Sequence, residues 1–113
     1  MEDSILLTVK KMIGGADGSY DHFDNDLILH INTFLAVLDQ LMADSNKPFR
    51  ITGEDETWED LGFSDDELGL IKDYIAIRTR LVFDPPSSSF VLDALKKTAD
   101  ELEFRILVSF DPR

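Results

Sequence analysis

Apolar residues recur at helical spacing in four segments of the chain, and this periodicity constrains the fold more than any other feature of the sequence. The clearest segment runs from about residue 24 to residue 43. Its apolar positions are Leu27, Ile28, Ile31, Phe34, Leu35, Leu38, Leu41 and Met42. Because successive residues of a helix are about 100° apart, these side chains share one face. A helix of this kind must bury its apolar face, and the other three segments supply helices against which it can pack.

The other three helices are expected from their start and stop signals. The first covers residues 5 to 13 and ends at Gly14-Gly15. The third begins at Ser64, which with Glu67 has the Ser-x-x-Glu form of a capping box. It ends before Pro85-Pro86, because proline has no backbone N–H to donate and restricts the residue before it. The fourth helix follows cap candidates at Ser87 to Ser89.

The third helix is expected to be central, because its apolar residues spread over about half of its circumference. The short break at Pro85-Pro86 favours an antiparallel hairpin of the third and fourth helices. Residues 44 to 63 form a long loop with a short extended piece at Phe49 to Thr52 and a turn around Trp58, which closes one end of the bundle. The sequence thus predicts one all-α domain over residues 1–113. It is a small helical bundle of three long helices plus a short N-terminal helix, with a long irregular loop between helices two and three.

Composition excludes several classes of protein. The chain has 113 residues, no cysteine, and 11 Lys plus Arg against 23 Asp plus Glu, which gives a net charge of −12. Disulfide scaffolds and thiolate zinc sites are therefore excluded, and a domain that grips nucleic acid by neutralising phosphates is disfavoured. No apolar run approaches the ~18 residues needed to span a membrane, and Met1-Glu2-Asp3 lacks the positive flank of a signal peptide. We expect a soluble protein made in a reducing cytoplasm.

Residues that could carry catalysis or hold a metal are scarce. The only histidines are His22 and His30. Asp26 and His30 stand four residues apart and could share a metal, but without a third ligand a surface pair is the simpler interpretation. A calcium loop starting at Asp17 would place His22 where glycine is needed and Ile28 where a bidentate glutamate is needed. We therefore expect no cofactor, no metal and no enzymatic activity.

A run of acidic residues without a single basic one occupies the end of the long loop and the start of the third helix. It consists of Glu54, Asp55, Glu56, Glu59, Asp60, Asp65, Asp66 and Glu67. The run is either a solvated loop or a surface that repels phosphate, so that a nucleic acid can pass without sticking. Arg78 falls near the middle of the apolar arc of the third helix, where it needs a carboxylate partner. That partner lies either in the same chain or in another subunit.

Some apolar residues of the fourth helix point away from its buried stripe. Phe104 and Val108 do so, and Leu107 and Phe110 add apolar area in the last turn. Leu29 likewise stands on the polar side of the second helix. Exposed apolar patches commonly contact a partner, so these side chains indicate a subunit or partner interface, unless the loop of residues 44 to 63 covers the end of the fourth helix.

The segment around the expected hairpin of the third and fourth helices resembles a known protein family. Residues 81–90, LVFDPPSSSF, followed by residues 101–106, ELEFRI, resemble the head-tail connector (adaptor, head-completion) proteins of tailed bacteriophages that infect low-GC Gram-positive bacteria. Residues 4–14 and 23–32 fit as well, so the similarity spans nearly the whole chain. The combination of the Asp-Pro-Pro-Ser hairpin with the Glu-Leu-Glu-aromatic-Arg helix is fairly specific.

The resemblance implies a non-enzymatic virion protein, built in the host cytoplasm, that assembles as a closed ring of about twelve copies beneath the portal protein. DNA would thread this ring without specific binding, and the ring would extend the portal channel and dock the next neck or tail component. It also implies that the C-terminal helix and tail grip the portal, which maps onto Glu101 to Arg113, with the tail at about residues 107–113. The alternative is an acidic DNA-mimic or regulatory protein that binds a basic partner, which would need carboxylates spaced like phosphates along one ridge.

Overall fold

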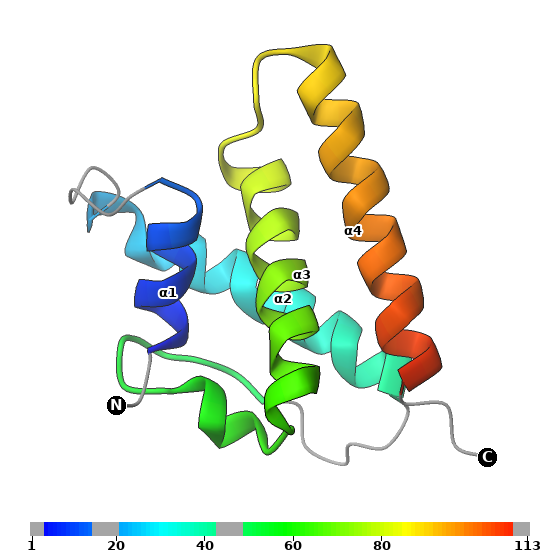
Figure 1. The fold of residues 1–113 in the computed structure, drawn as a ribbon. Helices are drawn as coiled ribbons and strands as arrows, with labels where there is room; N and C mark the ends of the chain where they lie inside the picture. Colours follow the sequence, from blue (N-terminus) through cyan, green and yellow to red (C-terminus); the bar gives the residue numbers. More distant parts are fainter. Residues whose placement is uncertain (1–3, 15–20, 43–48, 110–113) are drawn as a thin grey trace.

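The computed structural model describes residues 4–14, 21–42 and 49–109, and this part of the chain is all-helical, as the sequence predicts. Its elements are α1 (Ile5–Met12), the 3-10 helix η1 (Asp21–Phe23), α2 (Asp24–Met42), the 3-10 helix η2 (Trp58–Leu61), α3 (Asp65–Phe83) and α4 (Ser89–Ser109). The central helix is α3, which packs against α1, α2 and α4. Figure 1 shows α3 and α4 as an antiparallel hairpin, with α1 on the other side of α3 and α2 crossing behind. None of the described helices is both long and apolar enough to cross a membrane.

The helix ends lie where the local signals predict them. The Ser64 hydroxyl accepts a hydrogen bond from the Glu67 amide at 3.3 Å, and the Glu67 carboxylate accepts one from the Ser64 amide at 3.0 Å. These two bonds are the predicted capping box at the start of α3. The Ser88 hydroxyl accepts a hydrogen bond from the Val91 amide at 3.4 Å and caps α4. Gly14 follows α1 with φ +105°, a conformation that side chains with a Cβ rarely adopt.

The hydrophobic core gathers side chains from all four helices. From α2 it takes the predicted stripe at Leu27, Ile31, Leu35 and Leu38, each at most 3% exposed. The core residues of α1, α3 and α4 are Ile5, Leu6, Val9, Leu68, Ile71, Tyr74, Ile75 and Ile106. Burying each such side chain stabilises the fold by roughly 1.5–3 kcal/mol before the entropy cost of ordering it. The bundle is therefore held mainly by the faces that the periodicity identifies.

The loop before α3 shows contacts that the sequence does not predict. Residues 49–52 form no strand, and the backbone of Ile51 is paired instead with a side chain of α2. The Ile51 amide donates to Asn32 Oδ1 at 2.8 Å, and Asn32 Nδ2 donates to the Ile51 carbonyl at 3.0 Å. The expected turn at Trp58 is the 3-10 helix η2, which lies at the lower end of the bundle in Figure 1. The Trp58 side chain is fully buried. The Ile5 amide donates to the Glu56 carbonyl at 3.0 Å, which fastens the start of α1 to this loop.

Candidate interaction site

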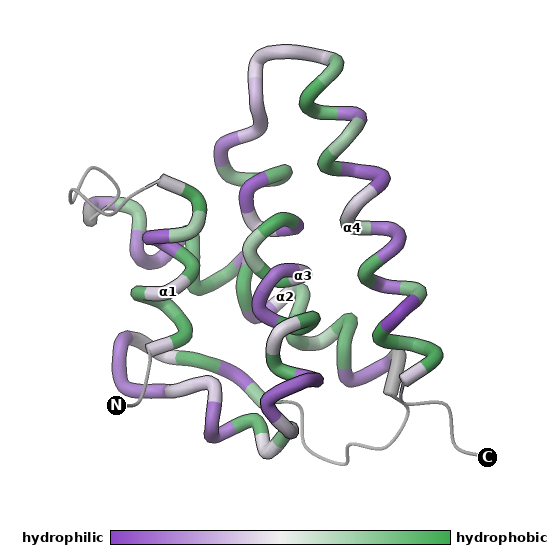
Figure 2. Tube along the Cα trace, in the orientation of Figure 1, coloured by the Kyte–Doolittle hydropathy of each residue, from purple (hydrophilic) through white to green (hydrophobic). Residues whose placement is uncertain are grey.

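The outer side of α4 is a second face with its own regular spacing. Starting at Phe90, exposed residues follow one another in alternating steps of four and three positions, the spacing of a helix–helix contact. The six are Phe90, Ala94, Lys97, Glu101, Phe104 and Val108, and we call this face the α4 seam. The buried residues Ala99 and Ile106 lie on the opposite side of the helix. Hydrophobic residues accordingly recur along α4 down to its last turn (Figure 2).

The two aromatic residues of the α4 seam, Phe90 and Phe104, are among the most exposed of the described apolar side chains. Phe90 is 83% exposed and Phe104 is 65% exposed, while Val108 and Leu107 are 52% and 43% exposed. The described part of the long loop, residues 49–63, leaves these side chains uncovered. Phe110, which the sequence groups with them, lies outside the described residues. The sequence reasoning missed Phe90, although its spacing of two heptads from Phe104 could have identified it.

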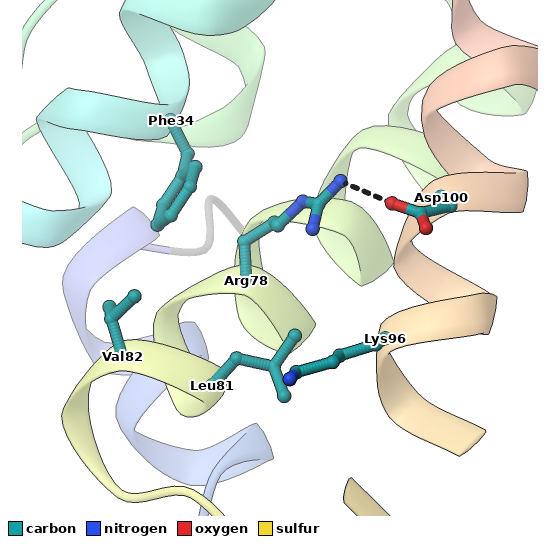
Figure 3. A pocket seen from close by; sticks show the side chains of 6 residues that line it. All are labelled: Phe34, Arg78, Leu81, Val82, Lys96 and Asp100. Carbon is teal, nitrogen blue, oxygen red and sulfur yellow. Dashed lines mark hydrogen bonds and ion pairs between the residues drawn. The ribbon is translucent and has the colours of Figure 1, made fainter. Parts of the chain in front are cut away.

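Arg78 joins the two helices of the hairpin. Its Nη2 donates to Asp100 Oδ1 at 3.0 Å (Figure 3) and to Glu103 Oε2 at 2.8 Å. The guanidinium carbon also lies 5.3 Å from the centroid of the Tyr74 ring. Burial lowers the pKa of Arg78, but hydrogen bonds with Tyr74, Asp100 and Glu103 outweigh it, and the pKa is raised overall. Burial also raises the pKa of Tyr74. The carboxylate partners of Arg78 thus lie in the same chain.

A hollow of about 400 Å³ lies beside this ion pair. Phe34, Leu81 and Val82 supply its apolar lining, and Arg78, Lys96 and Asp100 supply its charged lining. Figure 3 shows the Lys96 side chain reaching toward Leu81 while Asp100 faces Arg78. The hollow therefore lies between the last turns of α3, the middle of α4 and Phe34 of α2, and it is bordered by the Arg78–Asp100 ion pair.

The acidic run separates into two groups. The Glu56 carboxylate accepts hydrogen bonds from the Thr52 hydroxyl at 2.8 Å, the Thr52 amide at 3.1 Å and the Gly53 amide at 3.3 Å. These bonds, the Thr52 hydroxyl first, lower the pKa of Glu56 against the opposing effect of its burial. Asp60 accepts from the Thr57 amide at 2.9 Å, and Glu67 caps α3. These three carboxylates therefore stabilise the local backbone by accepting hydrogen bonds from its amides.

The remaining acidic residues of the run are exposed, and their carboxylates form no hydrogen bond or ion pair with the described part of the chain. They are Glu54, Asp55, Glu59, Asp65 and Asp66. A carboxylate without a local partner keeps its full field in the surrounding solvent. These five exposed residues of the acidic run therefore make the surface of this loop and of the start of α3 negatively charged.

No metal centre emerges in residues 4–14, 21–42 and 49–109. Asp26 is exposed and His30 is half-buried on α2. Within those ranges no three His, Asp or Glu side chains are placed to hold a metal ion together. Residues 17–20 of the calcium-loop candidate lie outside the described residues.

Comparison with known proteins places this helical chain in a family. Residues 5–113 match the family described as "Phage connector protein". No curated protein and no solved structure matches the chain. The matched range includes all four helices, the α3–α4 hairpin and the α4 seam. It bears out the resemblance to head-tail connector proteins, which are structural components of the phage particle and contact other head and tail components. The chain belongs to the phage connector protein family.

Proposed function

We propose that this connector assembles as a closed ring, of about twelve copies, beneath the portal protein and above the next neck or tail component. DNA passes through the bore of the ring. The chain performs this role by its shape and charge, and no bond-making step is involved. Family membership supports the connector role, and the exposed apolar end of α4 supports the docking contact.

The exposed apolar residues in the last turns of α4 are the main support for the portal contact. Phe104, Leu107 and Val108 expose 65%, 43% and 52% of their surfaces on a helix whose other side is fully buried at Ile106. Contiguous exposed apolar residues on a small domain usually mark an interaction site. We assign the portal contact to these three residues together with Phe110.

The acidic end of the molecule supports the passage of DNA. Glu54, Asp55 and Glu59 project from a loop whose backbone is fixed by Glu56 and Asp60. If these three carboxylates face the bore, phosphate contacts release no counterions and DNA remains mobile. The DNA-mimic alternative has weaker support, since a mimic needs its carboxylates free along a ridge, and those of Glu56 and Asp60 are engaged by backbone amides.

Two phenylalanines on the same helix provide the test. Phe104→Ala should weaken binding to purified portal rings about tenfold or more, as truncation of a central interface aromatic does. Phe90→Ala removes an equally large exposed ring about 21 Å away, at the other end of α4, and should leave portal binding intact. Circular dichroism should show unchanged helix content for both variants. Equal portal binding by wild type and Phe104→Ala would refute the assigned contact.

A further inference from the structure

The α4 seam is long enough and free enough to receive a second helix. Its six residues span about 27 Å from Phe90 to Val108 at 1.5 Å per residue. All six side chains are exposed, and α4 forms one outer edge of the molecule in Figure 1. The portal contact proposed above uses only the C-terminal part of this face, so it does not explain why the same spacing extends back to Phe90.

The order of residues along the seam makes it complementary to itself when reversed. We infer that two copies of the free chain pair through the α4 seam as an antiparallel, two-fold dimer. In this pairing Phe90 meets Val108 of the second copy, and Ala94 meets Phe104 of the second copy. Lys97 meets Glu101 of the second copy at the centre. Each large side chain thus faces a smaller one, and each charge faces its opposite.

Charge determines which partner binds the α4 seam and whether the two helices run parallel or antiparallel. Each chain carries a net charge of −12, so two copies attract only where their surfaces are neutral or complementary. The seam contains one cation, Lys97, and one anion, Glu101. A parallel pair would set Lys97 against Lys97 and Glu101 against Glu101, whereas the antiparallel pair forms two opposite-charge contacts. DNA is a poor occupant, because the seam carries no net positive charge.

The charges of Lys97 and Glu101 are consistent with this arrangement. Lys97 forms no ion pair with the described residues, so the second copy supplies its first partner. Glu101 accepts two hydrogen bonds from Arg105, at 2.9 and 3.2 Å, which hold its carboxylate on the surface of α4. Asp100 borders the seam and would lie near Asp100 of the second copy. Arg78 binds the Asp100 carboxylate at 3.0 Å but shares its single positive charge with Glu103, so the two facing aspartates are only partly neutralised and their repulsion opposes the pairing.

Charge reversal at the centre of the seam tests the inference. Sedimentation of the wild-type chain between micromolar and millimolar concentration should show a reversible monomer–dimer equilibrium. Lys97→Glu alone, or Glu101→Lys alone, converts two attractive contacts into two repulsive ones and should raise the dimer Kd about tenfold or more. Mixing the two single variants should restore association, because each chain then offers the charges that the other needs.

The matched control is Lys96→Glu, which changes the net charge equally one residue away and off the seam. It should leave the dimer Kd within about twofold of wild type. A wild-type chain that stays monomeric at millimolar concentration would overturn the inference. So would an equal loss of association in the Lys96 and Lys97 variants, or a mixture of the two single variants that fails to associate.

The dimer and the portal contact share Phe104 and can be separated by Phe90. Phe90→Ala should weaken the dimer and retain portal binding, while Phe104→Ala should weaken both. Loss of portal binding with an intact wild-type dimer would remove the proposed docking role and leave this inference standing. A wild-type chain that stays monomeric but binds the portal would overturn the dimer inference and leave the proposed docking role intact.

Discussion

At the scale of single residues, the Asn32 side chain makes the backbone hydrogen bonds that a neighbouring strand usually makes. Its side-chain amide satisfies both the amide and the carbonyl of Ile51, which is 1% exposed. Buried backbone groups require partners, and here one side chain supplies both. The loop is thereby fastened to α2 at its most buried point.

Asn32→Ala should therefore destabilise the fold by about 2–4 kcal/mol, because two buried backbone groups lose their hydrogen-bond partners. Urea unfolding followed by circular dichroism measures this change. Thr33→Ala is the control, since the Thr33 hydroxyl is exposed and donates to the Leu29 carbonyl of its own helix at 3.0 Å. That variant should stay within about 0.5 kcal/mol of wild type, and an Asn32 variant equally close to wild type would contradict the role given to this amide.

Glu56 gives the loop a pH dependence. Its pKa lies below the ordinary value of 4.5 in the folded chain, first because of the hydrogen bond from the Thr52 hydroxyl. The stability that its carboxylate contributes is fully present above about pH 4.5 and is lost as the pH falls through the lowered pKa. Glu56→Gln should flatten this part of the curve of unfolding free energy against pH. Glu54→Gln makes the same charge change at an exposed position and should leave the curve unchanged.

At the scale of elements, the sequence predicted the helix ends well because their causes are local. The capping box at Ser64 and Glu67 spans four residues, and Pro85-Pro86 acts on the residues directly before it. The partners of Ile51 and Arg78 could not be read in this way. They lie on other helices, and their choice depends on how those helices pack.

The same distinction applies to the candidate site. The exposure of Phe104 and Val108 follows from their angle on α4, which spacing alone defines. The engagement of Glu56 and Asp60 does not follow from the acidic composition of their segment, because it depends on the backbone path of the loop. Phe90 follows from the same periodicity, because it stands two heptads before Phe104 on α4.

The α3–α4 hairpin should depend more on Glu103 than on Asp100 for its ion pair. The Glu103 side chain is 32% exposed and the Asp100 side chain is 72% exposed, although both bind the same Arg78 nitrogen. Double-mutant cycles with Arg78→Met, Glu103→Gln and Asp100→Asn should give a coupling of about 1 kcal/mol to Glu103 and below about 0.5 kcal/mol to Asp100. The reverse order would show that solvent exposure does not decide the strength of this pair.

At the scale of the whole molecule, charge is distributed unevenly. The segment from Glu54 to Glu67 contains no basic residue, while α4 carries Lys96, Lys97 and Arg105 among its acids. Copies that turn their α4 helices toward partners therefore leave the acidic ends free to face a common axis. This distribution is compatible with a ring around DNA.

The placement of the acidic end at the bore can be tested with particles that carry Glu54→Lys and Glu59→Lys. Attraction between lysine and phosphate should slow triggered DNA release about twofold or more at low salt, and added salt should restore the rate. Asp26→Lys with Asp73→Lys makes the same charge change at exposed positions on α2 and α3 and should have no effect. Equal slowing by both pairs would place the acidic end outside the bore.

The bond between the Ile5 amide and the Glu56 carbonyl has a consequence for the order of folding. With eight residues, α1 is too short to persist alone in water, and its anchor lies some fifty positions along the chain. The α3–α4 hairpin closes over a turn of a few residues and can form early. We expect α1 to fold onto the bundle only after the Trp58 loop has formed. The same dependence should make α1 the first helix to detach when the protein begins to unfold.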